Sequence, residues 1–430
     1  MTEMSKQKIL IICYYWPPAG GPGVQRWLKF VKYLPDFGIE PIVYCPENPN
    51  YPIIDESLVD EIPNNVTVLK QPIKEPYGFA NMLSKKSSKK ISSGVIPKAK
   101  KQSLIEKLML YVRGNYFIPD ARKNWVNPSV DFLSNYISEN EIKTIITTGP
   151  PHSLHLIGLN LKAQTGVQWI ADFRDPWTTI GYHKALKLTE SSKNKHLTLE
   201  QNVLNTADKI IVTSNHTKNE FQSKTDQPIT VITNGYDSHS IRVEGKDKKF
   251  TLSHIGSLLS ERNPAVLWEV LSELVDEIEA FSGAFQLNLI GVVSDDVVES
   301  IHQHGLVQFL NVVGYVSHEE AIKFQMKSQL LLLIEIDSED TKAIIPGKIF
   351  EYLISETPIL AMGPKDADVE RIITSTNTGT YFNYNQKKEL KNQIMAYFES
   401  YQKNSLEVNG IGLQKYHRKA LTEQLVSLVR

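Results

Sequence analysis

Short runs of β-branched and aliphatic residues alternate along the chain with longer stretches in which apolar residues recur at helical spacing. We expect strands at residues 8–15, 41–45, 144–148, 169–173, 209–213 and 230–233, and again at 251–255, 286–290, 308–312, 330–334, 358–361 and 380–382. Strands that alternate with helices in this way form parallel sheets with crossover helices. The pattern therefore predicts an α/β fold.

The alternation starts again near residue 250, after a turn signal at Asn234-Gly235 and a polar stretch at 242–249. A chain of 430 residues is too long for one ordinary core. We therefore predict two Rossmann-like domains with parallel sheets facing a central cleft, at residues 1–240 and 241–405. Residues 406–430 are expected to form an amphipathic helix, which packs on its own domain or crosses back to the first.

Composition and charge exclude several classes of partner. With 47 Lys+Arg against 48 Asp+Glu, the formal net charge is -1, so no overall field attracts nucleic acid. Cys13 and Cys45 lie in apolar runs and are expected to be core residues in a reducing compartment. The first residues lack the zones of a signal peptide, and no apolar run is long enough to span a bilayer. We therefore expect a soluble, cytoplasmic protein.

One stretch departs from the alternation of strands and helices. Residues 85–101 contain seven lysines and no acidic residue, mixed with Ser and Gly, which indicates an exposed insertion. It is either a solvated loop or a contact with anionic lipid head groups, since basic residues are attracted to such a surface. The second alternative would place the protein at the inner face of a membrane.

A glycine turn follows the first expected strand. Gly20 and Gly21 stand there just before a helix whose apolar stripe begins at Val24. Because glycine has no Cβ, a ligand can approach this backbone closely, and the free N–H groups of the helix start favour an anion or a sugar oxygen. The turn is therefore either a plain turn or part of a ligand site.

Ligands of open parallel sheets bind outside the carboxyl ends of the strands, which directs attention to two segments of the second half. In Gly256-Ser257-Leu-Leu-Ser-Glu-Arg262-Asn263-Pro264, Asn263 is expected to cap a helix beside Arg262. An arginine at that place is either merely solvated or suited to a phosphate, to which a guanidinium can donate two parallel hydrogen bonds.

The second of these segments follows the very apolar run at 330–334. In Pro-Gly347-Lys348-Ile-Phe-Glu351-Tyr-Leu, Pro and Gly347 mark a helix start, Lys348 could neutralise a phosphate, and Glu351 could accept ribose hydroxyls one turn further on. The alternative is an ordinary surface pair of Lys and Glu. The apolar residues between them favour a buried helix, in which a carboxylate needs partners.

Two groups in the first half are also candidates. The segment 172–177 (Asp-Phe-Arg-Asp-Pro-Trp) places three charges directly after a strand. These charges either satisfy one another as a structural ion cluster or leave Arg174 and its neighbour Asp175 facing a substrate. His152 and His155 could move protons or be structural.

Several chemistries lack their motif. No His, Cys, Asp or Glu residues recur at convincing metal-ligand spacing, and neither a nucleophile elbow nor a phosphate loop is present. The glycine turn is not the Gly-x-Gly-x-x-Gly fingerprint of nicotinamide and flavin sites. We therefore expect no metal and no cofactor, and hydrolase and ATPase functions are disfavoured.

Taken together, the chain resembles the family 4 retaining glycosyltransferases of the GT-B fold, especially the bacterial members that build cell-surface polysaccharides. The matching segments, in order, are Pro-Pro-Ala-Gly-Gly with Arg26, Asp-Phe-Arg-Asp-Pro-Trp, Thr-Asn-Gly-Tyr-Asp, His-Ile-Gly-Ser-Leu and Pro-Gly-Lys-Ile-Phe-Glu-Tyr-Leu. The resemblance covers nearly the whole chain.

The resemblance implies transfer of a sugar from a nucleotide-diphosphate-sugar to a glycan or lipid-linked acceptor, with retention and without a metal ion. It implies an acceptor-side first domain and a nucleotide-sugar-binding second domain. Arg174 and Asp175 are then candidates for catalysis. The residues expected to bind the donor are Gly20, Gly21, Ser257, Arg262, Gly347, Lys348 and Glu351, with Arg262 and Lys348 on the diphosphate and Glu351 on the ribose.

The chain departs from the family pattern at two places. The family carries a second glutamate eight positions before the one matched by Glu351, where this chain has Ala343; Glu339 or Asp340 could substitute. Arg174 replaces the family's cleft histidine. These departures keep open a non-catalytic relative that only binds the nucleotide-sugar. A nonhydrolysing nucleotide-sugar epimerase, which shares this architecture, is the other alternative.

Overall fold

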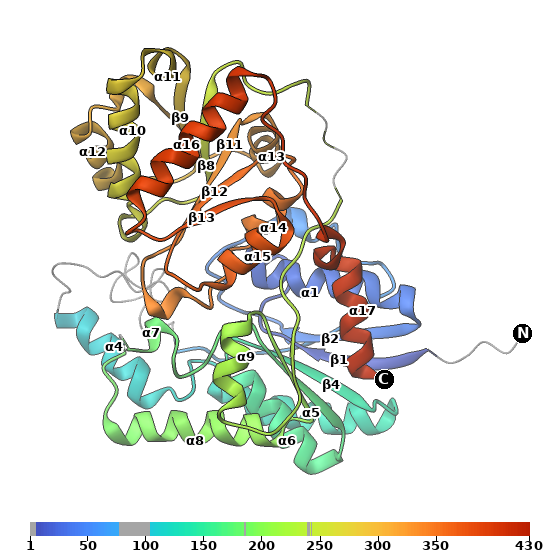
Figure 1. Ribbon diagram of the computed structural model, residues 1–430. Coiled ribbons are helices and arrows are strands. Elements are labelled where there is room, and N and C mark those ends of the chain that lie inside the picture. Colours follow the sequence, from blue (N-terminus) through green and yellow to red (C-terminus); the bar gives the residue numbers. More distant parts are fainter. Residues whose placement is uncertain (1–5, 77–103, 185, 239–240, 242) are drawn as a thin grey trace, which may run out of the picture. The chain divides into compact units, whose positions relative to one another are not determined.

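The computed structural model describes residues 6–76, 104–184, 186–238, 241 and 243–430 (Figure 1). The chain divides into two compact units. Unit 1 consists of Met1–Asn234 together with Arg418–Arg430, and unit 2 of Gly235–His417. The lysine-rich stretch at 85–101 lies outside the described residues.

In the described part of the chain, unit 1 has a seven-stranded sheet in which all neighbouring strands run parallel. The strand order is β3-β2-β1-β4-β5-β6-β7, so the chain starts in the middle and winds outward to both edges. The strands are β1 (Gln7–Ile12), β2 (Ile39–Pro46), β3 (Thr67–Gln71), β4 (Thr144–Gly149), β5 (Gln168–Phe173), β6 (Lys209–Val212) and β7 (Ile229–Val231).

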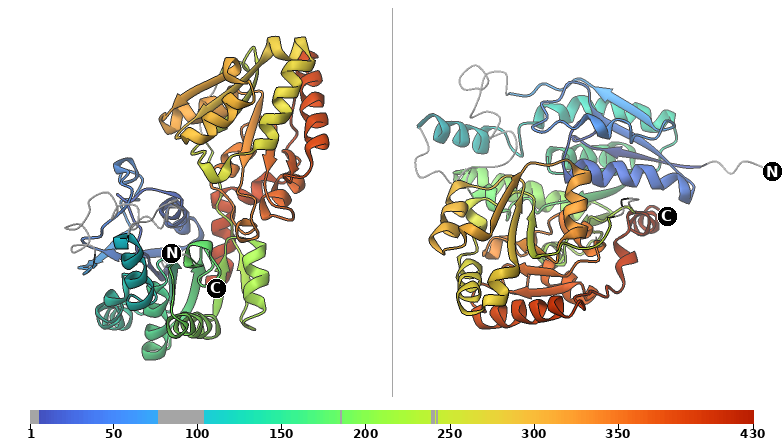
Figure 2. Two further views of the ribbon diagram at one scale, coloured as in Figure 1. Left: turned by 90° about the vertical axis from the view of Figure 1, so that its left-hand side faces the viewer. Right: turned by 90° about the horizontal axis from the view of Figure 1, so that it is seen from above.

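Helices cover both faces of this sheet (Figures 1 and 2). Because successive side chains of a strand point to opposite faces, Leu10 and Ile12 of β1 enter one core while Ile9 and Ile11 enter the other. The described helices of unit 1 are α1 (Pro22–Tyr33), α4 (Leu104–Tyr116), α5 (Val126–Glu139), α6 (Ser153–Thr165), α7 (Gly181–Lys184), α8 (Glu190–Thr206), α9 (Asn215–Gln222) and α17 (Arg418–Val429).

The final helix, α17, belongs to unit 1 although it follows unit 2 in the chain. Leu421 and Leu425 are buried in the same core as residues of β1 and α1. Arg418 donates from Nη1 to the Gln25 carbonyl at 2.8 Å. The segment just before α17 packs elsewhere, because Tyr416 lies in a core of unit 2. The helix expected at 406–430 therefore begins at Arg418.

Unit 2 has, among its described residues, a six-stranded parallel sheet in the order β10-β9-β8-β11-β12-β13. Its strands are β8 (Phe250–Ile255), β9 (Phe285–Ile290), β10 (Leu310–Gly314), β11 (Leu330–Ile334), β12 (Ile359–Met362) and β13 (Gly379–Phe382). Its described helices are α10 (Ala265–Glu277), α11 (Glu279–Ala284), α12 (Asp295–Gln303), α13 (His318–Lys327), α14 (Lys348–Leu353), α15 (Asp368–Thr376) and α16 (Lys387–Gln402).

The central strand β11 shows why unit 2 holds together. Leu330, Leu332 and Ile334 enter one core and Leu331 and Leu333 the other, and all five are fully buried. A strand covered on both faces needs an uninterrupted apolar run, which is how it appears in the sequence.

All twelve expected strands are present, most with bounds shifted by one to three residues. The strand that was not expected, β3, is an edge strand whose residues are exposed or half-buried, so it lacks an apolar run. Cys13 and Cys45 are buried and unpaired, as expected for core residues. None of the described helices is long and apolar enough to cross a membrane.

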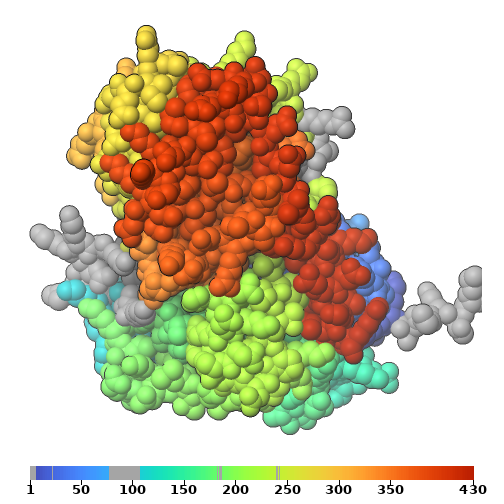
Figure 3. All heavy atoms as spheres, in the orientation of Figure 1, coloured from blue at the N-terminus to red at the C-terminus, as the bar shows by residue number. Residues whose placement is uncertain are grey.

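We predict that Leu425→Ala destabilises unit 1 by about 2–5 kcal/mol, because the cavity left in the core beneath α17 cannot fully collapse. Gln424→Ala, on the exposed side of the same helix, should change stability by less than about 0.5 kcal/mol. That outer side of α17 is visible in dark red in Figure 3.

Urea unfolding followed by tryptophan fluorescence checks this prediction. Five of the six tryptophans lie in unit 1, so the signal reports mainly on that unit. They are Trp16, Trp27, Trp125, Trp169 and Trp177. Equal midpoints for the two variants would show that α17 does not stabilise unit 1.

Candidate functional site

The carboxyl ends of β8 and β11 bring three charged side chains of unit 2 together. The chain leaves β8 through Gly256, whose φ of +114° favours glycine, and reaches Arg262 at the end of the short 3-10 helix Ser260–Arg262. Glu335 directly follows β11, and Lys348 is the first residue of α14. This edge is where open parallel sheets bind their ligands.

Lys348 is held by backbone and imidazole acceptors. Its Nζ donates to the Ile255 carbonyl at 3.1 Å and lies 3.3 Å from His254 Nε2. Because His254 Nδ1 lies 3.1 Å from the Leu332 carbonyl, we assign the ring proton to Nδ1, which leaves Nε2 as an acceptor. Burial lowers the pKa of Lys348, and the nearby Glu335 carboxylate opposes that shift.

Glu335 was not among the expected site residues. Its backbone is fixed, since its N–H donates to the Met362 carbonyl at 2.8 Å and its carbonyl accepts from the Tyr384 hydroxyl at 2.8 Å. Its side chain is 4% exposed, and Oε2 lies 3.9 Å from Arg262 Nη2. Burial raises the pKa of Glu335, while Arg262 and Lys348 act to lower it.

Two atoms of this group lack hydrogen-bond partners among the described residues. They are Glu335 Oε1 and Arg262 Nε, and both are buried. Buried polar atoms are normally paired, so unpaired ones in a native structure call for a partner such as a ligand or water. The sequence signal that could have found Glu335 is a charged residue directly after an uninterrupted apolar strand.

The other expected residues of unit 2 lie around this group. Gly256 lies next to Lys348, since a Cβ there would be in van der Waals contact with Nζ at 3.6 Å, and Ser257 is exposed beside it. Gly347 occupies the position before α14. Glu351, one turn beyond Lys348, is 31% exposed and accepts a hydrogen bond from Gln325 Nε2 at 3.0 Å.

One expected helix cap is wrong. Helix α10 begins at Ala265 with Pro264 in the cap position and no side-chain cap. Asn263 instead accepts a hydrogen bond on Oδ1 from Trp268 Nε1 at 2.7 Å. The buried indole needed an acceptor, and the asparagine supplies it.

Among the residues considered as substitutes for the missing glutamate, Glu339 is 83% exposed and pairs with Lys342 at 2.8 Å. Asp340 follows it in the short 3-10 helix Glu339–Thr341. Ala343 itself is half-buried. The buried carboxylate of this region is therefore Glu335.

In unit 1, the glycine turn is tightly built. Gly20 donates to the Ile53 carbonyl at 3.0 Å, and a Cβ on it would lie 2.8 Å from Ile53 Cγ2, so a larger residue here would force the Ile53 side chain to shift. Gly21 has φ of +104° and occupies the position before α1. The backbone of both glycines is partly exposed.

The three charges expected to lie together after β5 are separated. Asp172 is fully buried and forms an ion pair with Arg26 at 2.9 Å. It also accepts from Trp27 Nε1 at 2.9 Å and from Thr148 Oγ1 at 2.8 Å. This is a structural pair whose hydrogen bonds are all made within unit 1.

Arg174 takes no part in that pair. Its guanidinium donates to the carbonyls of Gly149 and Pro150, and a Cβ on Gly23 would collide with its Nη1, so Arg174 lies against the first turn of α1. Burial raises the pKa of Asp175, and Arg174 acts to lower it. Arg174 and Asp175 are both half-buried.

His152 and His155 are both buried in unit 1. His152 stacks on Trp177 at 4.7 Å between ring centroids, and His155 stacks on Phe173 at 4.2 Å. Burial lowers the pKa of His152 well below its ordinary value and that of His155 to about 3. Both rings are therefore neutral at pH 7 and act as packing groups.

Comparison with solved structures finds proteins that are similar to this chain over nearly its whole length. The lipopolysaccharide outer core galactosyltransferase WaaB in its apo form matches with a TM-score of 0.59 and 13% identity, over 98% of this chain and 99% of that one. S. aureus TarM, in a complex with fondaparinux, α-GlcNAc-glycerol and UDP, matches with a TM-score of 0.56 and 12% identity, over 98% and 99%. The chain has the GT-B fold. No protein-family model and no curated protein matches the sequence.

The same comparison also finds a different activity on this fold. A Listeria monocytogenes protein assigned as a UDP-N-acetylglucosamine 2-epimerase matches with a TM-score of 0.54 and 12% identity, over 99% of this chain and 96% of that one. Identities this low establish the fold and leave the activity to the residues of the site.

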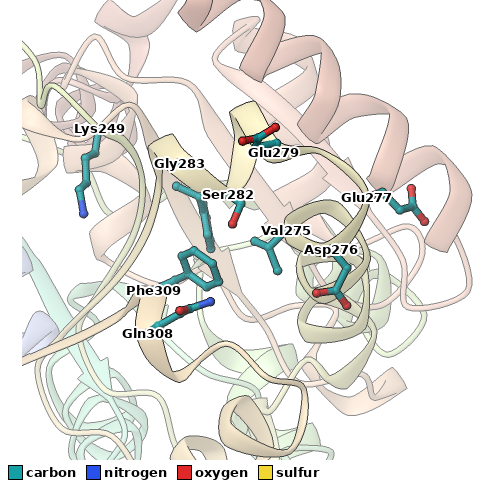
Figure 4. Close-up of a pocket in the computed structure, with 10 residues that line it drawn as sticks. Lys249, Val275, Asp276, Glu277, Glu279, Ser282, Gly283, Gln308 and Phe309 are labelled. Carbon is teal, nitrogen blue, oxygen red and sulfur yellow. The ribbon is translucent and has the colours of Figure 1, made fainter.

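Unit 2 also has a shallow cavity of about 620 Å³ at the opposite edge of its sheet (Figure 4). Lys249, one residue before β8, and Phe285, the first residue of β9, mark this place as the amino ends of the strands. Its rim carries three carboxylates, Asp276, Glu277 and Glu279. Lys249 also lines the cavity, and Lys391 forms an ion pair with Glu277, but the carboxylates outnumber these cations, which disfavours a diphosphate there.

Within the described ranges, no group of three or more His, Cys, Asp or Glu side chains is placed to hold a metal ion.

We predict that unit 1 loses stability as the pH falls below about 6.5, where histidines of the unfolded chain take up protons. In the folded state the pKa of His155 is lowered to about 3 and that of His183 to about 4. Between about pH 6.5 and these values the unfolded state therefore binds more protons than the folded state. The loss is about 1.4 kcal/mol per pH unit for each such histidine.

The variant His155→Asn tests this assignment, because asparagine keeps an acceptor for the Thr147 hydroxyl, 2.9 Å from Nδ1, and cannot titrate. Its unfolding free energy should fall less steeply between about pH 6.5 and pH 4.5 than that of the wild type. Parallel curves from urea unfolding would rule out a contribution from His155.

Proposed function

We propose that the chain is a glycosyltransferase that moves a sugar from a nucleotide-diphosphate-sugar to a glycan or lipid-linked acceptor. The observation that carries this proposal is the convergence of Arg262 and Lys348 on one buried carboxylate, Glu335, at the ligand-binding edge of the sheet in unit 2. Two fixed cations beside unpaired polar atoms suit a diphosphate, and the fold is one on which glycosyltransferases are built.

The diphosphate would find donors already in place. Lys348 uses two of its three N–H donors on Ile255 and His254, which leaves one for a phosphate oxygen. Arg262 contributes the unpaired Nε. When the bond to the sugar breaks, negative charge grows on the leaving diphosphate, and preorganised cations stabilise it. We therefore propose that the reaction needs no metal ion.

The remaining roles follow from position. Glu351 is open to solvent and can accept ribose hydroxyls, while the backbone at Ser257 and Gly347 lies beside the two cations. In unit 1, we propose that Gly21 offers its backbone N–H to the donor, and that Gly20, whose N–H already donates to the Ile53 carbonyl, lets the donor approach because it has no side chain. Arg174 and Asp175 are proposed as catalytic residues, and retention at the anomeric carbon is proposed from the family resemblance.

A structure of similar fold supports this substrate class, since the TarM complex contains UDP and α-GlcNAc-glycerol. An epimerase remains the second candidate because an assigned epimerase shares the fold. Incubation with a nucleotide-sugar alone separates the two, since isomerisation of the sugar without an acceptor would favour the epimerase. Binding without isomerisation or transfer would favour the non-catalytic alternative.

A thermal-shift screen with UDP, GDP, ADP and dTDP tests the proposal directly. A ligand present at about 100 times its Kd stabilises the folded state by about 2.7 kcal/mol. The base that raises the melting temperature then selects the nucleotide-sugars for transfer assays with lipid-linked acceptors, in the presence of EDTA. No shift with any of the four would remove the proposed donor site.

We predict that Glu351→Ala weakens binding of the nucleoside diphosphate by about 1.5–3 kcal/mol, the range for a hydrogen bond to a charged group. Glu389→Ala, an exposed glutamate on α16, is the matched control and should leave affinity unchanged. Calorimetry checks both variants. Unchanged affinity in a folded Glu351→Ala variant would exclude the ribose role.

We further propose that the protein contacts an anionic membrane through α4. The inner side of this helix carries Leu110, which is buried, and Gly114, where a Cβ would collide with Leu186 and Leu188. The outer side exposes four large apolar residues at helical spacing, Leu108, Tyr111, Val112 and Tyr116. Helix α4 lies at the edge of unit 1 (cyan in Figure 1).

The charge near this stripe favours a lipid surface over a protein partner. Lys107 and Arg113 lie on the same helix, and the chain just before it contains the lysines of 85–101. Stable attachment of a peripheral protein takes two signals, such as buried apolar area and basic residues near anionic lipid. A protein at that surface would meet a lipid-linked acceptor directly.

We predict that Leu108→Glu combined with Tyr116→Glu lowers binding to vesicles of phosphatidylglycerol and phosphatidylcholine at low salt, because it puts negative charge where the apolar stripe would enter the head groups. Ile411→Glu, which changes an exposed apolar residue of unit 2, is the control. Equal sedimentation of both variants with the vesicles would exclude α4 as the membrane contact.

A further inference from the structure

The carboxylate of Glu335 stands beside two cations without a hydrogen bond to either. Its Oε2 is 3.9 Å from Arg262 Nη2, which is too far for one, and Oε1 has no partner among the described residues. The two hydrogen bonds that Lys348 Nζ makes go to the Ile255 carbonyl and to His254 Nε2, and not to Glu335. The carboxylate therefore balances charge here without fixing geometry.

The charges of this group do not match the ligand of the proposed function. Two cations and one carboxylate leave one net positive charge, whereas the diphosphate of a nucleotide-sugar carries two negative charges. A diphosphate that reaches Arg262 and Lys348 also comes close to Glu335, and a nearby like charge disfavours an ionised carboxylate. Protonation of Glu335 would remove the repulsion and make the group doubly positive.

We infer that a nucleotide diphosphate binds to this group together with one proton, which the Glu335–Lys348 pair takes up. The inference rests on the proposed function. The pair holds one proton in the empty site and two in the occupied one, with Lys348 as ammonium and Glu335 as a carboxylic acid that can donate to a phosphate oxygen. The charge of each residue acts on the ionisation of the other, so the proton is assigned to the pair.

Burial prepares the pair for this change. It raises the pKa of Glu335 and lowers that of Lys348, which brings the two toward each other. In the empty site, the charge of Glu335 favours the ammonium form of Lys348, and the charges of Arg262 and Lys348 favour the carboxylate form of Glu335. A bound dianion shifts that balance toward the fully protonated pair.

The other titratable groups that face this pair stay in one state near neutral pH or lie further out. Burial lowers the pKa of His254 well below its ordinary value, and burial raises the pKa of Tyr352, Tyr381 and Tyr384. The remaining charged neighbours are Arg262, Asp337 and Glu351, with His318 beyond Glu351.

The expected pH dependence has a definite sign. If binding takes up a proton, a higher pH opposes it, so affinity must fall as pH rises. For one linked proton the fall is at most about tenfold per pH unit. A diphosphate site built from permanently charged cations alone would show no such dependence.

Calorimetry of the full-length protein tests the inference with UDP-glucose, GDP-mannose, ADP-glucose and dTDP-glucose. Both phosphates of a nucleotide-sugar are esterified, so the ligand itself does not titrate near neutral pH, unlike a free nucleoside diphosphate. Titrations in Tris and in HEPES, buffers with different ionisation enthalpies, give the number of protons taken up. Between about pH 6 and pH 9 the uptake should rise above about half a proton.

The double variant Glu335→Gln with Lys348→Arg assigns the proton. It keeps two cations and replaces the carboxylic acid by a neutral isostere, so its affinity should be independent of pH and its proton uptake lost. Glu335→Gln alone is the milder variant. Glutamine mimics the protonated carboxylic acid and leaves Lys348 as the titrating member of the pair, so the uptake profile must move to higher pH.

The outcomes separate the two proposals. If none of the four nucleotide-sugars binds, the proposed function fails and this inference fails with it. If one binds without proton uptake, the inference alone is overturned and the donor site stands. Two further results would also overturn the inference, because they would place the proton on another group. One is proton uptake that persists in the double variant, and the other is a pH profile of uptake that does not change in Glu335→Gln.

Discussion

Both units are built on a parallel sheet that is buried on its two faces, and this burial decides where charged side chains can lie. Leu330 to Ile334 of β11 leave no polar position within the strand, so the first polar side chain, Glu335, comes where the strand ends. The same holds in unit 1, where Asp172 stands near the end of β5. Parallel strands end at one edge, so these groups collect there.

Each of the two sheet edges has a buried carboxylate beside an arginine, but only in unit 1 do the two groups form a close ion pair. In unit 1, Asp172 and Arg26 lie 2.9 Å apart, and Trp27 and Thr148 complete the carboxylate's hydrogen bonds. In unit 2, Glu335 and Arg262 are 3.9 Å apart, with a buried atom unpaired on each. A buried ion pair whose hydrogen bonds are all made stabilises the fold, and removing either partner would destabilise it. A buried pair with unpaired polar atoms is stabilised when a ligand supplies the missing hydrogen bonds. The edge of the unit 2 sheet is therefore the candidate site.

The strands could be predicted from the sequence because each buried strand is an apolar run of its own. The edge strand β3 could not, since its residues are half-exposed and alternate poorly. Lys348 and Glu351 were predicted as site residues because charged side chains in a largely apolar, buried helix need polar partners. Glu335 and the displaced cap at Asn263 were missed for one reason: both depend on partners distant in the chain, the cations in one case and Trp268 in the other.

The near-neutral net charge of the chain means that attraction of a dianionic donor depends on the local charges of the site. With a net charge of -1, no long-range field concentrates a dianionic donor, so recognition depends on groups in contact with it. Contact charges that are partly desolvated are screened less by salt than surface charges. Two cations left without a counter-charge in an empty site would be costly to bury, and Glu335 offsets that cost. The same carboxylate must then be neutralised when the donor arrives, and a proton is the smallest group that can do it.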